Sequence, residues 1–176
     1  MDVDRAAADD SMRSISREEV DWDAVFEDQL PRIYNYFRFR LGSDPLAEDL
    51  TACTFEKAWR ARDRYRRDAA GFSTWLYRIA HNVGVDHLRA RRSHAPLEAA
   101  LEVAADSTPA TEAERGSNFA RLARLMTSLT ERERELISLK YGAALGNRAI
   151  AELTGLSESN VGTILSRTVQ ALRSQW

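Results

Sequence analysis

Residues 147–166, NRAIAELTGLSESNVGTILS, decide the fold of the last part of the chain because they predict a helix-turn-helix. Ile150 and Leu153 fall on the inner face of a short first helix. Gly155 follows that helix and can adopt the backbone conformation of a tight turn. Ser157 is then placed to cap a second helix by accepting hydrogen bonds from its first-turn N–H groups.

The second helix has two chemically different faces. Its apolar side chains predict one buried stripe, made of Val161, Leu165, Val169 and Leu172. The outer face carries short polar side chains and one arginine, in the order Ser159, Asn160, Thr163, Arg167 and Gln170. Such a helix fits the major groove of duplex DNA, so the stretch predicts DNA binding. Two helices joined by a glycine turn also occur in plain helical bundles, and this alternative stays open.

The composition is that of an ordinary globular protein, and we expect no metal or cofactor. Its 176 residues allow one domain or two small ones, and four prolines and eight glycines favour helix. No apolar run reaches about 18 residues and the acidic N-terminus does not resemble a signal peptide, so we expect a cytoplasmic protein without membrane insertion. Cys53 is the single cysteine, and the three histidines lack partners at ligand spacing.

Charge is segregated along the chain, although the net charge is only -2. Residues 57–92 hold ten bases and three acids, and residues 115–176 hold nine bases and five acids. Residues 1–30, in contrast, hold ten acids and three bases, and residues 93–114 hold five acids and no base. The two basic bodies suit a polyanion at two separate places, and aromatic residues interleave with the first of them.

The periodicity predicts an all-α protein with two small helical domains. Residues 1–20 read as a disordered acidic tail, 21–92 as a helical bundle, 93–112 as a flexible acidic linker and 113–176 as the helix-turn-helix domain. In the bundle we expect one helix from Trp22 to Leu41, kinked or restarted at Pro31, and a second capped by Asp44. A basic loop over 63–71 then leads to a third helix, from about Ser73 to Arg92.

Two more local patterns carry structural expectations. The second helix of the bundle is expected to bury Leu46, Leu50, Phe55, Ala58 and Trp59, and the third to bury Trp75, Leu76, Ile79, Ala80 and Val83. In the second domain, Thr130 and Glu133 have the spacing of a capping box that opens a helix.

Three motifs in this order resemble those of the extracytoplasmic-function sigma factors, which keep only regions two and four of the sigma-70 family. They are AEDLTACTFEKAW over 47–59, FSTWLYRIAHN over 72–82, and LTERERELI over 129–137 running into the helix-turn-helix. The resemblance covers about 22–173. It implies a bacterial RNA polymerase subunit that directs the core enzyme to promoters and is not itself an enzyme.

The resemblance also implies a role for each motif. The second helix of the bundle would dock on the clamp helices of the largest polymerase subunit, through Asp49, Leu50, Phe55 and Trp59. The following loop and helix would take the unstacked strand of the minus-ten element, through Tyr65, Arg66, Arg67, Arg78, His81, Asn82 and Arg89. The recognition helix would read the minus-thirty-five element as duplex, through Ser159, Asn160, Thr163 and Arg167. Core polymerase with its flap, promoter DNA and an anti-sigma factor are the implied partners.

The chain departs from the family pattern at three sites, the third of which is His81, where the family often has Arg. Ala52 and Cys53 stand where the family commonly has Gln and Glu, and Gly162 and Ile164 stand where it often has Lys and Arg. The second departure predicts few phosphate contacts in region four. It keeps open the reading of a helical interaction protein that binds polymerase or a sigma antagonist without reading promoters. A third reading is a one-domain helix-turn-helix repressor, which would not need the tryptophan-rich first domain.

Overall fold

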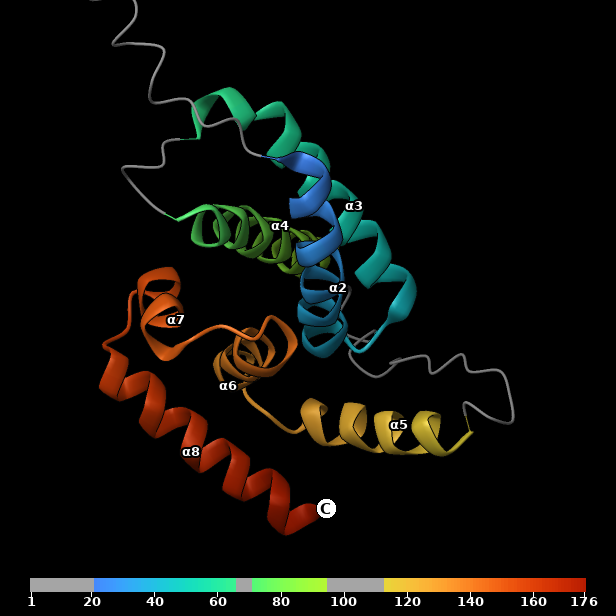
Figure 1. The fold of residues 1–176 in the computed structure, drawn as a ribbon. Coiled ribbons are helices and arrows are strands. Elements are labelled where there is room, and N and C mark those ends of the chain that lie inside the picture. Colours follow the sequence, from blue (N-terminus) through green and yellow to red (C-terminus); the bar gives the residue numbers. More distant parts are fainter. Residues whose placement is uncertain (1–20, 66–70, 95–112) are drawn as a thin grey trace, which may run out of the picture.

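The computed structural model describes residues 21–65, 71–94 and 113–176, and every regular element in these ranges is helical (Figure 1). The predicted tail, residues 66–70 of the basic loop and most of the predicted linker lie outside the described residues. The first half of the chain contains α2 (Trp22–Leu41), α3 (Asp44–Arg60), the short η1 (Arg62–Arg64) and α4 (Phe72–His94). The second half contains α5 (Ala113–Thr127), α6 (Glu131–Ile137), the π-helical turn η2 (Ser138–Gly142), α7 (Asn147–Thr154) and α8 (Glu158–Gln175).

Local signals set both ends of α2. Asp21 caps its start by accepting from the backbone N–H groups of Asp23 and Ala24, and Gly42 ends it in the left-handed conformation at φ 68°. The helix runs through Pro31 as one element, so the expected restart there is wrong. Proline removes only one backbone hydrogen-bond donor. The helix continues through it because α2 is stabilised by its packing against α3.

The start of α3 lies one residue earlier than expected. Ser43 occupies the cap position, while Asp44 is the first helical residue and Pro45 follows it inside the first turn. The Asp44 carboxylate is instead paired with Arg38 of α2, with its Oδ1 2.7 Å from Arg38 Nε. Asp44 therefore ties two helices together rather than capping one of them.

The core of the first half lies where α2, α3 and α4 meet. Ile33, Tyr36 and Phe37 of α2 are fully buried, and α3 contributes Ala47, Thr54, Phe55 and Ala58. The buried residues of α4 are Leu76, Tyr77, Ala80 and Val83. Trp75 and Ile79 are only half-buried, and Trp59, expected in the core, is 52% exposed.

The second half is organised around α6 and the turn that follows it. The capping box is confirmed: Thr130 Oγ1 accepts from the Glu133 backbone N–H at 3.3 Å, and the Glu133 carboxylate accepts from the Thr130 backbone N–H at 2.9 Å. Leu136, Leu139 and Ile150 are buried together with Val161 of α8. The chain then passes through Ala144, a non-glycine residue with a φ of 56°.

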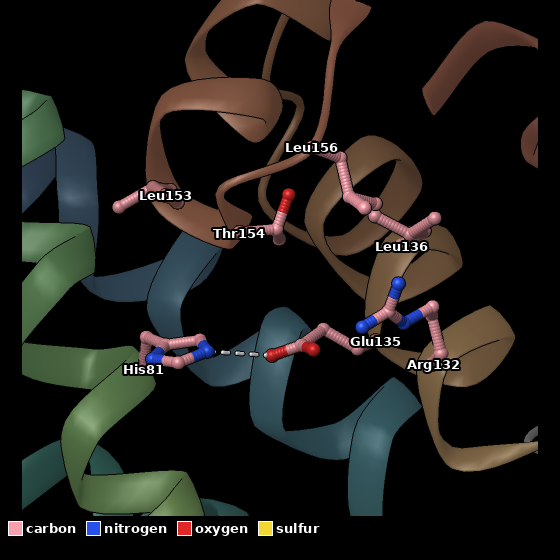
Figure 2. Close-up of a pocket in the computed structure, with 7 residues that line it drawn as sticks. All are labelled: His81, Arg132, Glu135, Leu136, Leu153, Thr154 and Leu156. Atoms are coloured by element: carbon pink, nitrogen blue, oxygen red, sulfur yellow. Dashed lines mark ion pairs between the residues drawn. The ribbon is translucent and has the colours of Figure 1, made fainter. Parts of the chain in front are cut away.

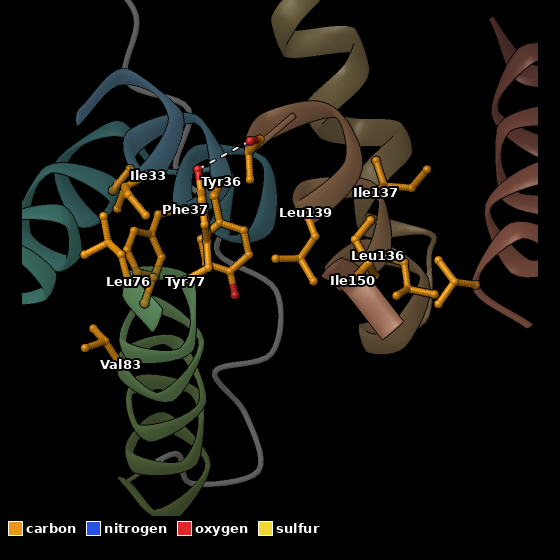
Figure 3. Close-up of a cluster of buried hydrophobic side chains, with 14 of the residues drawn as sticks. Ile33, Tyr36, Phe37, Leu76, Tyr77, Val83, Leu136, Ile137, Leu139 and Ile150 are labelled. Atoms are coloured by element: carbon orange, nitrogen blue, oxygen red, sulfur yellow. Dashed lines mark hydrogen bonds between the residues drawn. The ribbon is translucent and has the colours of Figure 1, made fainter. Parts of the chain in front are cut away.

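The two halves pack against each other and share one continuous apolar cluster (Figure 3). The turn η2 lies against α2, and α7 lies against α4. Tyr77 of α4 donates its hydroxyl to the backbone carbonyl of Ala143 at 3.4 Å, which joins the halves by a buried hydrogen bond. The two helical bodies expected from the sequence are therefore in direct contact in this structure.

Candidate nucleic-acid interface

The helix-turn-helix consists of α7, a three-residue turn and α8. Gly155 ends α7 in the left-handed conformation at φ 72°, where a side chain would be strained. Ser157 begins α8 as predicted, because its hydroxyl accepts from the Asn160 backbone N–H at 3.2 Å. These two residues set the angle at which α8 leaves α7. That angle determines which side chains of α8 face away from the rest of the domain.

The buried stripe of α8 is confirmed in part. Val161 and Leu165 are buried as expected, and Val169 and Leu172 are half-buried. Thr168 is buried although it is polar, because its hydroxyl donates to the Ile164 carbonyl at 2.9 Å and so needs no outside partner. Sequence periodicity assigned this position to neither face. The local back-bond makes threonine act as an apolar residue here.

The four predicted duplex-reading residues of α8 share one exposed surface. They are Ser159, Asn160, Thr163 and Arg167, and all four are exposed. Thr163 donates its hydroxyl hydrogen to the Ser159 carbonyl at 3.0 Å, which leaves its oxygen as an acceptor and its methyl group as an apolar contact. The surface thus offers an amide, a hydroxyl acceptor and one guanidinium to a base edge.

The two positions without the family's usual charges have structural neighbours. A Cβ at Gly162 would lie 3.5 Å from the side-chain nitrogen of Asn147, so this position faces the start of α7. Asn147 in turn accepts from Lys140 Nζ at 3.0 Å. Ile164 is half-buried and belongs to the apolar cluster. Helix packing therefore takes up Ile164, whereas Gly162 faces the start of α7 with room for a small side chain.

The residues of the first half that were predicted to read the single strand differ in their exposure. Arg78, Asn82 and Arg89 are exposed on α4. His81 is half-buried and its Nε2 lies 2.9 Å from Glu135 Oε1 of α6 (Figure 2). Arg66 and Arg67 lie outside the described residues. The structure thus brings three of the predicted residues onto one helix surface and places a fourth against the other half.

Tyr65 belongs to an aromatic cluster at the open end of the first half. Its ring centroid lies 5.3 Å from those of Phe72 and Trp75, and Trp22 lies 5.5 Å from Phe72. Trp59 joins the cluster through Trp22 at 5.4 Å. Sequence analysis placed Trp22 in a core helix only and missed its contact with this end. Rings at such spacings pack edge-on or tilted against one another, so Tyr65 is held at this end of the bundle.

The face of α3 predicted to contact polymerase combines exposed and buried members. Asp49 is exposed and Leu50 is half-buried. Trp59 is exposed, with the Arg62 guanidinium 4.5 Å from its ring centre. Phe55 is only 9% exposed and its ring centre lies 4.9 Å from that of Phe26 in an edge-on contact, so Phe26 presents the exposed ring at this place. Phe26 was not among the predicted contact residues.

Two residues that were not predicted as site residues form the most buried charged pair among the described residues. Arg40 of α2 is 4% exposed, and its Nη1 lies 2.7 Å from Glu135 Oε1. Arg40 Nη1 also donates to the Tyr36 hydroxyl. Burial alone would raise the pKa of Glu135, but the hydrogen bond from His81 and the charge of Arg40 hold that pKa below its ordinary value. No sequence signal pairs residues 95 positions apart.

A small cavity opens beside this cluster. Its volume is about 80 Å³, and Figure 2 shows that its lining comes from both halves: His81, Arg132, Glu135, Leu136, Leu153, Thr154 and Leu156. Among the described residues, no three His, Cys, Asp or Glu side chains are grouped so that they could hold a metal ion. None of the described helices is long and apolar enough to cross a membrane.

Comparison with protein families identifies both halves. Residues 25–94 match the model for sigma-70 region 2, and residues 119–172 match the model for sigma-70 region 4. These two matches define the class of protein as the sigma-70 family. The matched ranges contain the helical bundle with α4 and the helix-turn-helix with α8.

Curated relatives narrow the class. The ECF RNA polymerase sigma factor SigK of Mycobacterium ulcerans is 30% identical over 172 residues, which cover 92% of this chain and 88% of the relative. The ECF sigma factor RpoE of Cereibacter sphaeroides is 30% identical, with the same two coverages. BldN of Streptomyces coelicolor is 27% identical, and the alignment spans 57% of its length. The chain belongs to the ECF sigma factors of the sigma-70 family.

Solved structures share the fold. The sigma factor RpoE of Bartonella quintana, in complex with the anti-sigma factor NepR, superposes with a TM-score of 0.73 over 88% of this chain and 95% of that chain, at 20% identity. CnrH in complex with the cytosolic domain of CnrY superposes with a TM-score of 0.60 over 86% of this chain and 82% of that chain, at 25% identity. The helical bundle and helix-turn-helix are therefore a known arrangement.

Proposed function

We propose that this protein binds core RNA polymerase in the cytoplasm and directs it to promoters, using the first half for the minus-ten element and the second half for the minus-thirty-five element. The proposal rests on two features that occur in one chain. The first is a capped helix-turn-helix whose second helix has an exposed polar face, and the second is the basic helix α4, which begins beside an aromatic cluster. No step of this function needs a chemical group to react. The protein acts by binding and positioning.

The second half reads duplex in this proposal. Asn160 and Arg167 supply amide and guanidinium donors for base edges, and Thr163 supplies a methyl group and an acceptor. Arg167 and Arg173 are the basic residues of the described α8. Because α8 carries few cations, its binding to DNA would release few counterions from the phosphates. We therefore expect the free protein to bind duplex weakly.

The first half captures a single strand. Bases that leave the stack bind well to aromatic faces flanked by cations, and Tyr65 leads from the aromatic cluster into the arginine-containing loop. Arg78, Asn82 and Arg89 are exposed on α4 and would hold the strand. Arg66 and Arg67 are assigned to this role from the sequence alone.

Polymerase docking is assigned to the outer side of α3. Asp49 offers the charge and Trp59 the exposed apolar surface for the clamp helices, with Leu50 beside them. We assign Phe55 the supporting role, because it lies beneath the exposed Phe26. The polymerase flap is the expected contact of the second half. An anti-sigma factor is the further expected partner, since RpoE of Bartonella quintana and CnrH are each complexed with a partner protein.

Run-off transcription with purified core polymerase on a promoter library tests the proposal. We expect initiation at specific sites only when this protein is added. Sequence-specific duplex binding by the free protein without transcription would favour a repressor. Polymerase binding without promoter selection would favour an interaction protein that has lost promoter reading.

Two variants locate the DNA contacts. Arg167→Ala is expected to lower transcription, and a base contact would be worth about 1 to 3 kcal/mol of discrimination at one promoter position. Arg173→Ala, an exposed arginine in the last turn of the same helix, is the matched control. Asn82→Ala should reduce permanganate reactivity of the opened strand while a pull-down of core polymerase is unchanged. Asn118→Ala, exposed on α5, is its control.

A further inference from the structure

Arg62 and Trp59 form a cation–aromatic pair on the surface at the end of α3. The guanidinium carbon of Arg62 lies 4.5 Å from the centre of the indole ring, and Arg62 Nη1 donates to the Trp59 backbone carbonyl at 2.8 Å. Trp59 is 52% exposed, and Arg62 is exposed as well. A cation over an indole ring is attracted to the negative face of its π-system. This attraction and the hydrogen bond together hold the guanidinium over the ring and leave the pair open to solvent.

The indole ring of this pair is itself held by the aromatic cluster. Trp22 meets Trp59 edge-on, with ring centres 5.4 Å apart and an interplanar angle of 80°. Trp22 also lies 6.4 Å from Trp75, and Trp75 lies 5.3 Å from Tyr65. Edge-on and tilted contacts of this kind favour particular ring orientations. The Arg62–Trp59 pair and Tyr65, to which a stacked base of the strand is assigned, are therefore connected through one aromatic cluster.

The short turn η1 sets the distance between this pair and Tyr65. The backbone N–H of Tyr65 donates to the Arg62 carbonyl at 3.2 Å, and that of Arg64 donates to the Ala61 carbonyl at 2.9 Å. At a rise of about 2.0 Å per residue, the Cα atoms of Arg62 and Tyr65 are separated by roughly 6 Å. Neighbouring nucleotides of a stacked strand are about 3.4 Å apart along its axis, and an unstacked strand can extend further. Two nucleotides of one strand can therefore reach both residues.

The surface around the pair is cationic. Lys57, Arg60 and Arg64 are exposed on the same short stretch, and Asp63 is the one acid between residues 57 and 64. Single-stranded nucleic acids bind where cations follow the phosphates and flat groups stack on the bases. A guanidinium can do both, because it is charged and planar. Arg62 thus offers the chemistry that binds an unpaired nucleotide.

Arg62 also has a purely structural role. Its hydrogen bond to Trp59 satisfies one of the last carbonyls of α3, and the helix dipole favours a cation at this end. This role predicts a loss of stability when the arginine is removed. It predicts no effect on DNA, so experiment can separate the structural role from a role in binding.

We propose that Arg62, held over Trp59, stacks an unpaired base of the displaced promoter strand at a second base-binding position beside that of Tyr65. The inference rests on the proposed function and adds to it a residue and the group that this residue binds. Planar guanidinium groups stack on bases, and every base has the π-face that such stacking requires. The position therefore strengthens binding of the open strand with little preference for the base that occupies it.

The base analogue aminopurine reports stacking at a single position, because its fluorescence is quenched when it stacks. Holoenzyme made with the full-length protein is added to fork-junction DNA whose displaced strand is unpaired over the minus-ten element and carries the analogue at each position in turn. We expect the parent to quench the analogue at two positions. Arg62→Ala should abolish one of these quenches and weaken binding to the fork DNA roughly tenfold, equivalent to about 1.4 kcal/mol.

Two further variants separate stacking from charge. Arg62→Lys keeps the charge but lacks the planar group, so it should lose the same quench and recover only part of the affinity. Arg124→Ala removes an exposed arginine of α5 and should match the parent in both measurements. Pull-downs of core polymerase should show parental binding for all three variants, because Trp59 itself is unchanged. Circular dichroism should show parental helix content for each of them.

Parental quenching and affinity in Arg62→Lys would overturn the proposal, because a point charge would then suffice. A lower melting temperature in Arg62→Ala with parental quenching at every position would overturn it in favour of the structural role. Loss of core binding in either variant would assign Arg62 to polymerase docking instead.

The free full-length protein with an aminopurine-labelled single-stranded oligonucleotide repeats the test without polymerase. Quenching that depends on Arg62 there, in a protein that supports no transcription, would mean that the proposed function fails while the base-binding position stands. Quenching that is independent of Arg62, both there and in the holoenzyme, would overturn the base-binding position whether or not the protein directs transcription.

Discussion

Arg134 is expected to be the main anchor of the α5 to α6 junction, so Arg134→Ala should destabilise the second half. Its guanidinium donates to two backbone carbonyls of the last turn of α5 and one of the connection that follows: Nε to Met126 at 2.9 Å, and Nη2 to Thr127 at 3.3 Å and Leu129 at 3.1 Å. The last carbonyls of a helix lack i+4 partners within it, although Met126 also accepts from the Leu129 backbone N–H at 3.3 Å, and the negative end of the helix dipole favours a cation there. Burial of the site lowers the pKa of Arg134, although the side chain stays charged at neutral pH.

The magnitude follows from these contacts. A hydrogen bond to a charged group contributes roughly 1.5 to 3 kcal/mol. The three bonds share one half-buried side chain and water can replace part of them, so we expect a total loss of about 2 to 3 kcal/mol rather than their sum. For a protein of this length the melting temperature should fall by about 4 to 12 °C.

Urea and thermal unfolding of three variants measure the effect. Arg134→Lys keeps the charge but lacks the planar fork, so it should recover part of the loss. Arg132→Ala, an exposed arginine of the same helix, should leave the melting temperature near that of the parent. An Arg134→Ala protein that melts with the Arg132→Ala control would refute the assignment of this guanidinium as the junction's anchor.

Three further predictions concern local geometry and charge. Ser157→Ala removes the cap of α8 and should lower the free energy of unfolding by about 1 kcal/mol, measured in urea, with Ser166→Ala as the exposed control. Ala144→Gly should raise it by about 0.5 to 1 kcal/mol, because φ 56° strains alanine and suits glycine; a loss of stability would count against this. The contact of Glu135 with Arg40 should weaken in acid: the pKa of Glu135 is depressed in the folded protein, so the stabilisation is complete above the ordinary value of 4.5 and is lost as pH falls below it. Urea unfolding at pH 6 and pH 4 checks this, and the loss of stability between the two should be smaller for Glu135→Gln than for the parent.

The order of helices and the turn between α7 and α8 could be predicted because their causes are local. Glycine at Gly155 and a hydroxyl at Ser157 act on backbone groups within three residues, and the capping box of Thr130 spans the same distance. Apolar periodicity likewise located α2, α3 and α4. The family motifs in turn identified both halves of the chain.

Local signals were insufficient where burial depended on a neighbouring element. Trp59 follows the apolar stripe of α3, but its ring is left exposed near the helix end, where it meets Trp22 and Arg62. Thr168 is buried because its own backbone satisfies its hydroxyl. Asp44 pairs with Arg38 across two helices instead of capping. In each case a competing contact outweighed the pattern.

The sequence by itself determined an all-α chain with a bundle, a helix-turn-helix and the polar residues on the outer face of α8, since helix periodicity and caps act over a few residues. Only the tertiary structure decided that the two halves close on each other. Arg40, His81 and Glu135 lie on three separate helices, and Gly142 fits against α2 only because the backbones approach so closely. Such contacts depend on distances in space, which residue spacing along the chain does not encode.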